Sequence, residues 1–389
     1  MTQLQTILEP ILDDLSFVDE KLKDFSQSSD LPSLDKLLKH VFSSKGKRAR
    51  PALTILASGF HPHDKSNVIT MAAAVEMLHV ATLIHDDTVD EADTRRGRIT
   101  ISSGWGDRIA VLVGDYVFAA SATFVCDTGD IQVIRRFSET IMELSRGELQ
   151  EISLSGNVDG NISEYLQRIY FKTGSLFATS GESGARLSGA DIGIVRILTD
   201  YSRKIGTAFQ IIDDILDFEA DEISLGKPVG SDLLNGIVTL PTIFAMEDNN
   251  IQNLVRRYFE EGKHETILEE LVNLIRESNA INRAQEYAEN LSREARESLT
   301  RLPANRSRES LEELTHFIVR RISELKLHLG ISSNTSAQCQ NRGNSWQFFE
   351  GYFKRISIEE KDVCIHTWIE TSFSIGHTAY HGTGPSSHI

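Results

Sequence analysis

Apolar residues recur every three to four positions through almost all of the first 330 residues of this 389-residue chain. This spacing gathers them on one face of a helix, and short breaks rich in Gly, Pro, Asn and Asp separate the helical stretches. We expect helices near residues 3–24, 33–42, 48–60, 65–92, 106–126, 130–152, 162–187, 191–219, 238–247, 250–261, 265–278, 281–301 and 306–329. No part of this stretch alternates convincingly as a strand would. The pattern therefore predicts an all-α domain over residues 1–330, built as a helical bundle.

Residues 331–389 differ from this domain in composition. They are rich in Ser, Thr and Gly, and they hold two of the three cysteines and two of the three tryptophans. Residues 363–375 alternate as a strand would, but no partner strand is predicted beside them. We expect an atypical, poorly ordered C-terminal tail without a catalytic role.

Two aspartate motifs of the form D-D-x-x-D lie inside apolar, helix-compatible runs and begin at Asp86 and Asp213. Because a helix turns about 100° per residue, the three aspartates of each motif share one face. Carboxylates crowded on an apolar helix repel one another and are costly to bury. Divalent cations such as Mg²⁺ relieve this, since they take oxygen ligands from carboxylates and phosphates, so two facing clusters would hold a metal-bridged diphosphate. The six aspartates are Asp86, Asp87, Asp90, Asp213, Asp214 and Asp217.

The composition is acidic, with 56 Asp and Glu residues against 40 Lys and Arg residues and a formal charge of −16. Nucleic-acid binders carry a basic face, so we expect no nucleic-acid partner. A polyanionic substrate is still compatible with this charge, because bound divalent ions reverse the local sign.

The three cysteines lie far apart in the sequence and form no C-x-x-C motif, which favours a reducing compartment. The first residues carry early acids and no basic segment, so they resemble neither a signal peptide nor a transit peptide. We find no window of 18 apolar residues and expect no transmembrane segment. These features predict a cytoplasmic protein.

Cationic segments accompany the aspartate motifs. Residues 46–51 read GKRARP, and TRRGR begins at Thr94, shortly after the first motif. Arginine offers a planar fork that suits phosphate oxygens, and lysine acts as a point charge. With LIHDDTVDEADTRRG, GDYVF, YFKTGS, FQIIDDILDF, GKPVGSD and TLP, these segments make residues 46–241 resemble the trans-type polyprenyl diphosphate synthases. The resemblance continues more loosely over residues 1–330.

The resemblance implies an isoprenoid-synthase-type all-α fold, a helical bundle around a deep central cavity. It also implies an enzyme of the long-chain, octaprenyl- or solanesyl-like branch. Such a prenyltransferase condenses isopentenyl diphosphate with an allylic diphosphate through an allylic cation and releases a trans-polyprenyl diphosphate. The resemblance further implies a homodimer, roughly three Mg²⁺ ions per active site, and transient membrane contact when a long product leaves.

The resemblance also assigns roles to individual residues. The six aspartates match metal ligands, and one departure from the family pattern is Ile237, where many relatives carry lysine after glycine. The other matched positions are Lys47, Arg50, His79 and Arg96 for the isopentenyl diphosphate headgroup, Arg95, Lys172 and Lys227 for the allylic diphosphate, and Thr173 and Gln210 beside the reacting carbons.

Product length is predicted from the helix that carries the first aspartate motif. Ala81 and Thr82 lie five and four residues before Asp86, about one turn below it on the side that a growing chain would pass. Small residues leave this path open, and Met77 is the next obstacle. We expect a long-chain product, although close helix packing is an alternative reason for the small side chains.

Three alternatives to a long-chain synthase stay open at this point. A shorter-chain, geranylgeranyl-type synthase would share every motif. A class I terpene cyclase would share the fold and the ionisation step, but such enzymes usually carry Asn, Ser and Glu ligands at the second motif. A non-catalytic subunit of a heteromeric synthase would tend to lose aspartates, whereas this chain keeps all six.

Overall fold

The structure is a computed structural model, and it describes residues 3–43, 46–95, 97–219, 229–262 and 264–328. Side-chain surroundings are described up to residue 319. Arg96, Lys227 and residues 331–389 lie outside the described residues. The predicted tail, and the domain boundary before it, therefore stay predictions.

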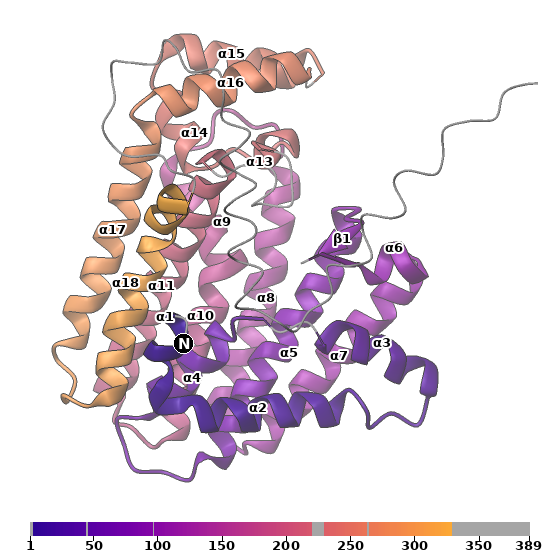
Figure 1. The fold of residues 1–389 in the computed structure, drawn as a ribbon, viewed down its shortest axis with the longest axis vertical. Helices are drawn as coiled ribbons and strands as arrows, with labels where there is room; N and C mark the ends of the chain where they lie inside the picture. The colour runs from indigo at the N-terminus through magenta and orange to yellow at the C-terminus, as the bar shows by residue number, and fades with distance from the viewer. Residues whose placement is uncertain (1–2, 44–45, 96, 220–228, 263, 329–389) are drawn as a thin grey trace, which may run out of the picture. The chain divides into compact units, whose positions relative to one another are not determined.

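The described part of the chain is helical almost throughout, which confirms the predicted all-α class (Figure 1). One short 3₁₀ turn, η1 (Glu9–Ile11), and one π-helical turn, η2 (Tyr170–Gly174), accompany the α-helices. The α-helices are α1 (Gln3–Ile7), α2 (Leu12–Phe25), α3 (Pro32–Phe42), α4 (Ala49–Ser58), α5 (Lys65–Val89), α6 (Ile101–Trp105), α7 (Asp107–Asp127), α8 (Ile131–Ser153), α9 (Ile162–Ile169), α10 (Ser175–Leu187), α11 (Ile192–Glu219), α13 (Ser231–Leu234), α14 (Leu240–Ala245), α15 (Asn249–Glu260), α16 (Glu265–Glu277), α17 (Ala280–Leu299) and α18 (Arg306–His328).

The structure departs from the predicted elements in the segments around the cavity. A small antiparallel hairpin, β1 (Thr94–Arg95) and β2 (Arg98–Ile99), stands where no strand was expected. Its strands are too short to show alternation in the sequence. The short helices α6 and α13 were also missed. The single helix predicted over residues 162–187 is divided into α9, η2 and α10. The sequence did not indicate this division, because a π turn keeps a helix-like spacing of apolar residues.

Two long helices begin at aspartate caps. Asp64 accepts a hydrogen bond from the backbone nitrogen of Ser66 at 3.0 Å and starts α5. Asp130 accepts hydrogen bonds from the nitrogens of Gln132 and Val133 and starts α8. These caps satisfy donors that the first turn of a helix leaves open, and they fix where α5 and α8 begin.

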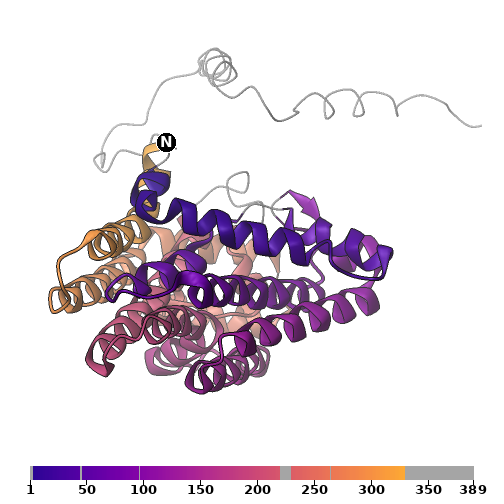
Figure 2. The ribbon, with the colours of Figure 1, turned by 90° about the horizontal axis from the view of Figure 1, so that it is seen from below.

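The helix α10 connects the two aspartate motifs in space, because it packs against both α5 and α11. The first motif lies at the end of α5 and the second at the end of α11. Further layers complete the bundle: α7 packs on α5, α17 packs on α11, and α2 crosses α4 and α5 (Figures 1 and 2). Both motifs therefore lie on helices that are packed into the apolar core of the bundle.

Two helices of the described residues, α5 and α7, are long and apolar enough to cross a membrane by length and composition alone. Neither helix holds an unbroken run of 18 apolar residues, since Glu76 interrupts α5 and Asp115 interrupts α7, and the expected absence of a transmembrane segment stays a prediction. The window in α5 is 72% buried inside the bundle, as in a core helix, whereas the window in α7 is only 33% buried. Many apolar residues of α7 are thus exposed on the surface of the bundle.

Candidate functional site

A cavity of about 730 Å³ opens between α5, α11, α18 and the segments that precede α4 and follow α9. Small-molecule sites typically measure roughly 300–1,000 Å³. Acidic, cationic and apolar side chains all line it. They include the acids Asp86, Asp90, Asp213 and Asp214, the cations Lys47, Arg50, Arg95 and Lys172, and the apolar residues Phe177, Phe209, Leu314, Phe317 and Ile318.

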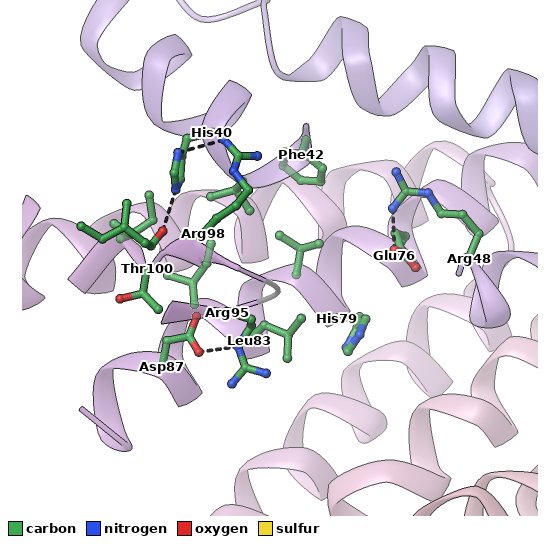
Figure 3. A pocket seen from close by; sticks show the side chains of 15 residues that line it. His40, Phe42, Arg48, Glu76, His79, Leu83, Asp87, Arg95, Arg98 and Thr100 are labelled. Carbon is green, nitrogen blue, oxygen red and sulfur yellow. Dashed lines mark hydrogen bonds and ion pairs between the residues drawn. The ribbon is translucent and has the colours of Figure 1, made fainter. Parts of the chain in front are cut away.

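The first aspartate motif sends two of its three side chains into this cavity. Asp86 and Asp90 line it, whereas Asp87 is buried and forms an ion pair with Arg95. Figure 3 shows this pair at the edge of a smaller side pocket. Burial, followed by repulsion from the Glu148 carboxylate, raises the pKa of Asp86 to about 7. The crowded charge at Asp86 favours a bound cation.

The second motif is more deeply buried. Asp213 and Asp214 line the cavity, and Asp214 accepts hydrogen bonds from the Tyr165 hydroxyl at 2.6 Å and from Gln210 Nε2 at 2.9 Å. Burial and the neighbouring Asp232 carboxylate hold the pKa of Asp214 well above its ordinary value.

Asp217, the last aspartate of the second motif, does not line the cavity. It is fully buried and accepts hydrogen bonds from Ser231 Oγ at 2.7 Å and from the Asp232 nitrogen at 3.1 Å. The expectation that all six aspartates converge on one cavity is therefore wrong for Asp87 and Asp217. Side chains on one helix face still point in directions that differ by tens of degrees around the helix axis. A hydrogen-bond donor elsewhere in the chain can therefore bind one of these carboxylates outside the cavity. The metal-ligand role predicted for the six stays a prediction.

The arrangement fits a metal that arrives together with a phosphate ligand. Among the residues that the structure describes, no three acidic, histidine or cysteine side chains are close enough to hold an ion by themselves. Mg²⁺ needs only one or two carboxylates when substrate phosphates complete its shell. Asp86 and Asp90 on one side and Asp213 on the other provide such carboxylates.

Lys172 lies on the π turn η2 and contacts two glutamates of α8. Its Nζ is 3.2 Å from Glu148 Oε1 and also forms an ion pair with Glu151. Burial opposes its charge, but the carboxylates of Glu151 and Glu148 outweigh burial and raise the pKa of Lys172. Lys172 is therefore held as a cation inside the cavity.

The next residue, Thr173, belongs to a chain of side-chain hydrogen bonds. Its hydroxyl donates to Gln210 Oε1 at 2.7 Å, and Gln210 in turn donates to Asp214. The two residues predicted to flank the reacting carbons are thus adjacent, and they are linked to the second aspartate motif.

Three of the predicted headgroup residues line the same cavity. Lys47, Arg50 and His79 all line it, and the Arg50 guanidinium lies 4.8 Å from the centre of the Phe177 ring. Ile237 lines the cavity as well, so the position where many relatives carry lysine contributes an apolar surface. Arg96 and Lys227 belong to the same predicted set but are not among the described residues.

The predicted chain-length residues are divided by the structure. Thr82 lines the cavity, but Ala81 and Met77 are fully buried in the core and do not line it. Of the two residues expected along the path of a growing chain, Thr82 lies on the cavity wall and Ala81 does not, and the chain-length role predicted for them stays a prediction. Ala81 is small because neighbouring helices pack closely against α5.

Sequence reasoning missed three acidic residues of the site. Glu151 and Asp232 line the cavity, and Glu148 contacts Lys172 beside Asp86. The motif GKPVGSD contains Asp232, so its acidic end was an available signal. Glu148 and Glu151 lie one turn apart on a helix with many polar residues, where they resembled a solvated face.

Comparisons with known proteins agree with this geometry. A family model for polyprenyl synthetase matches residues 31–275. Heptaprenyl diphosphate synthase component 2 of Bacillus subtilis (strain 168) is 37% identical over 309 residues, which cover 79% of this chain and 88% of that protein.

Two solved structures show the same fold. Polyprenyl synthase from Caulobacter crescentus CB15, complexed with calcium and isoprenyl diphosphate, aligns with a TM-score of 0.77 and 31% identity over 82% of this chain and 98% of that chain. Geranylgeranyl pyrophosphate synthase from Lactobacillus brevis aligns with a TM-score of 0.76 and 29% identity over 82% of this chain and 99% of that chain. This chain therefore belongs to the polyprenyl synthetase family of prenyltransferases.

Proposed function

We propose that this chain condenses isopentenyl diphosphate with an allylic diphosphate and releases a trans-polyprenyl diphosphate. One observation carries the proposal: carboxylates from the ends of α5 and α11 and cations from three other segments line a single cavity. Such a cavity can hold two diphosphate groups side by side despite the acidic composition of the chain.

In this reaction, the four aspartates that line the cavity would hold the metal, which we propose is Mg²⁺, with roughly three ions per site; they are Asp86, Asp90, Asp213 and Asp214. When bound, Mg²⁺ neutralises the allylic diphosphate and makes it a leaving group. Lys172 and Arg95 bind and orient the same diphosphate through charge-assisted contacts. These residues lie on different elements, so they hold the group from several sides.

The second substrate occupies the other side of the cavity in this proposal. Lys47, Arg50 and His79 bind the isopentenyl headgroup, and Thr173 and Gln210 lie beside the carbons that react. The apolar wall around Phe177 and Phe209 excludes water from the reacting carbons. The rate enhancement comes from positioning and electrostatics, and no strong protein base is required.

The test is incubation of purified protein with Mg²⁺, isopentenyl diphosphate and a series of allylic primers, followed by product sizing. We expect chain elongation that EDTA abolishes, and a loss of at least about 100-fold in kcat for Asp213→Asn. Cyclised hydrocarbon formed from an allylic diphosphate alone would instead support the terpene cyclase alternative.

We further propose a long-chain product. Thr82, the α5 residue that lines the cavity one turn below the first motif, is small, and the Bacillus subtilis relative is named for a heptaprenyl product. A geranylgeranyl-type product is the second candidate, because a synthase named for that product shares the fold equally well. Product sizing distinguishes the two directly.

We propose that two copies of the chain pair through α7 and α8. Apolar side chains on these helices are largely exposed, among them Leu112 at 65% and Met142 at 67%. Burying each such side chain contributes about 1.5–3 kcal/mol. Light scattering should give the mass of a dimer for the purified chain, and Leu112→Glu should shift it toward the monomer.

A heteromer is the alternative, because the Bacillus subtilis relative is named as one component of a synthase. A monomer that is inactive alone and gains activity from a second protein would support this alternative.

A further inference from the structure

We propose that the ion pair between Arg48 and Glu76 positions the two cations that bind isopentenyl diphosphate. Arg48 lies between Lys47 and Arg50 in the sequence, and it contacts Glu76 on α5. Neither Arg48 nor Glu76 was assigned a role by the sequence motifs. The inference rests on the proposed function, because it assigns the isopentenyl headgroup to Lys47 and Arg50.

The backbone at Arg48 needs an external support. Arg48 precedes the first residue of α4 with φ 50° and ψ 32°, in the left-handed region. Residues with a Cβ avoid this region, and they keep it only where the surroundings hold them there. Lys47 and Arg50 lie on either side of this position and both line the cavity, so a change in the Arg48 backbone would move one relative to the other.

The side chain of Arg48 provides that support through two carboxylates. Nη1 is 2.6 Å from Glu76 Oε1, and Nε is 2.8 Å from Asp19 Oδ1 on α2. Only 6% of the Glu76 side chain is exposed, against 52% for Asp19. Figure 3 shows Arg48 and Glu76 facing each other at one end of the side pocket. The buried contact with Glu76 is therefore the principal anchor, because solvent screens the other.

The position of Glu76 explains why this anchor affects the substrate. Glu76 lies three residues before His79 on α5, and both line the cavity. The ion pair thus connects the segment with Lys47 to the helix with His79, so it sets the distance between two sides of the proposed headgroup pocket. The other end of the segment is held separately, where α4 packs against α10.

A competing interpretation is that Arg48 itself binds the diphosphate and that Glu76 only reduces its charge. The two interpretations predict opposite effects of removing the Glu76 charge. Loss of a positioning contact weakens isopentenyl diphosphate binding, whereas loss of a competing carboxylate strengthens it.

The experiment uses Glu76→Gln in the full-length chain, with isopentenyl diphosphate alone as the calorimetric probe. We expect Kd and KM for isopentenyl diphosphate to rise by about tenfold or more, since small misplacements of binding groups have large effects. The kcat and the KM for the allylic diphosphate should change less than about twofold. Arg48→Lys should reproduce this result, because an ammonium group cannot replace the fork that reaches both carboxylates.

Asp14→Asn is the matched control. Asp14 is also a buried carboxylate of an ion pair between α2 and α5, 2.7 Å from Lys65, but it does not line the cavity. This variant should lower thermal stability to a similar degree and leave the KM for isopentenyl diphosphate unchanged. The double variant of Arg48 and Glu76 should bind no more weakly than the weaker single variant.

Tighter or unchanged binding by Glu76→Gln would overturn the inference, as would an equal loss in Asp14→Asn. If Glu76→Gln does not fold, Glu76→Asp decides by the same criteria, because the shorter side chain withdraws the carboxylate from Arg48 Nη1 and leaves the guanidinium in place. A wild-type chain that binds no isopentenyl diphosphate would instead overturn the proposed function.

Discussion

Replacing Tyr165 with Phe removes a single buried hydroxyl that donates to the second aspartate motif. The hydroxyl lies 2.6 Å from Asp214 Oδ2, and both side chains are buried. Removing one partner of a buried hydrogen bond costs about 1–3 kcal/mol, and the phenyl ring keeps the shape of the site. We therefore expect Tyr165→Phe to lower the free energy of unfolding by about 2 kcal/mol.

The same variant should weaken metal binding. The Tyr165 hydroxyl lowers the pKa of Asp214, against burial and Asp232, which raise it. Without the hydroxyl, this pKa rises further, and a proton competes more strongly with a cation for the carboxylate. The Mg²⁺ concentration for half-maximal activity should increase, and the increase should be largest at low pH.

A matched control is available in Tyr258, which is fully buried but whose hydroxyl makes no hydrogen bond among the described residues. Tyr258→Phe removes the same atom without removing a bond, so its stability should be unchanged or slightly higher. Urea unfolding of both variants and of the unmodified chain measures the difference. Equal stabilities of the two variants would refute the role of the Tyr165 hydrogen bond.

Three further predictions concern the cavity itself. The pKa of Asp86 is raised to about 7, so its carboxyl group is increasingly protonated and neutral below pH 7. Mg²⁺ affinity measured by calorimetry should therefore fall by about tenfold per pH unit below pH 7, and a flat profile would contradict this. Thr82→Phe should shorten the products seen by chromatography because Thr82 lines the cavity, whereas Ala81→Phe should chiefly lower stability because Ala81 is buried in the core. Gly147→Ala should reduce kcat by roughly 100-fold. A Cβ at this position would lie 2.7 Å from the backbone nitrogen of Lys172 and would displace η2. Activity equal to that of the unmodified chain would show that η2 tolerates the shift.

The sequence predicted the helical class and the two aspartate motifs because both depend on local spacing. Apolar periodicity is a property of each helix alone, and the D-D-x-x-D spacing needs no other part of the chain. The same reasoning could not place Asp87 or Asp217, since their orientations depend on partners elsewhere in the sequence. Arg95 comes from the hairpin and Ser231 from α13, and neither element was predicted.

The glutamates beside Lys172 show a second limit of sequence reasoning. Glu148 and Glu151 are i and i+3 on α8, a pattern that equally describes a solvated helix face. Their role becomes visible only when the π turn η2 brings Lys172 against α8. A π turn has no distinct sequence period, so neither the turn nor this contact could be predicted.

The close packing of α10 against α11 at Gly181 means that a substitution far from the aspartates can affect them. A Cβ at Gly181 would lie 2.0 Å from Ser202 Oγ, so the two helices pack this closely only because residue 181 has no side chain. The helix α10 carries none of the aspartates, yet it separates the helices that do. Adding one methyl group there would force α10 and α11 apart, so the position of the second aspartate motif depends on a helix that contributes no carboxylate to it.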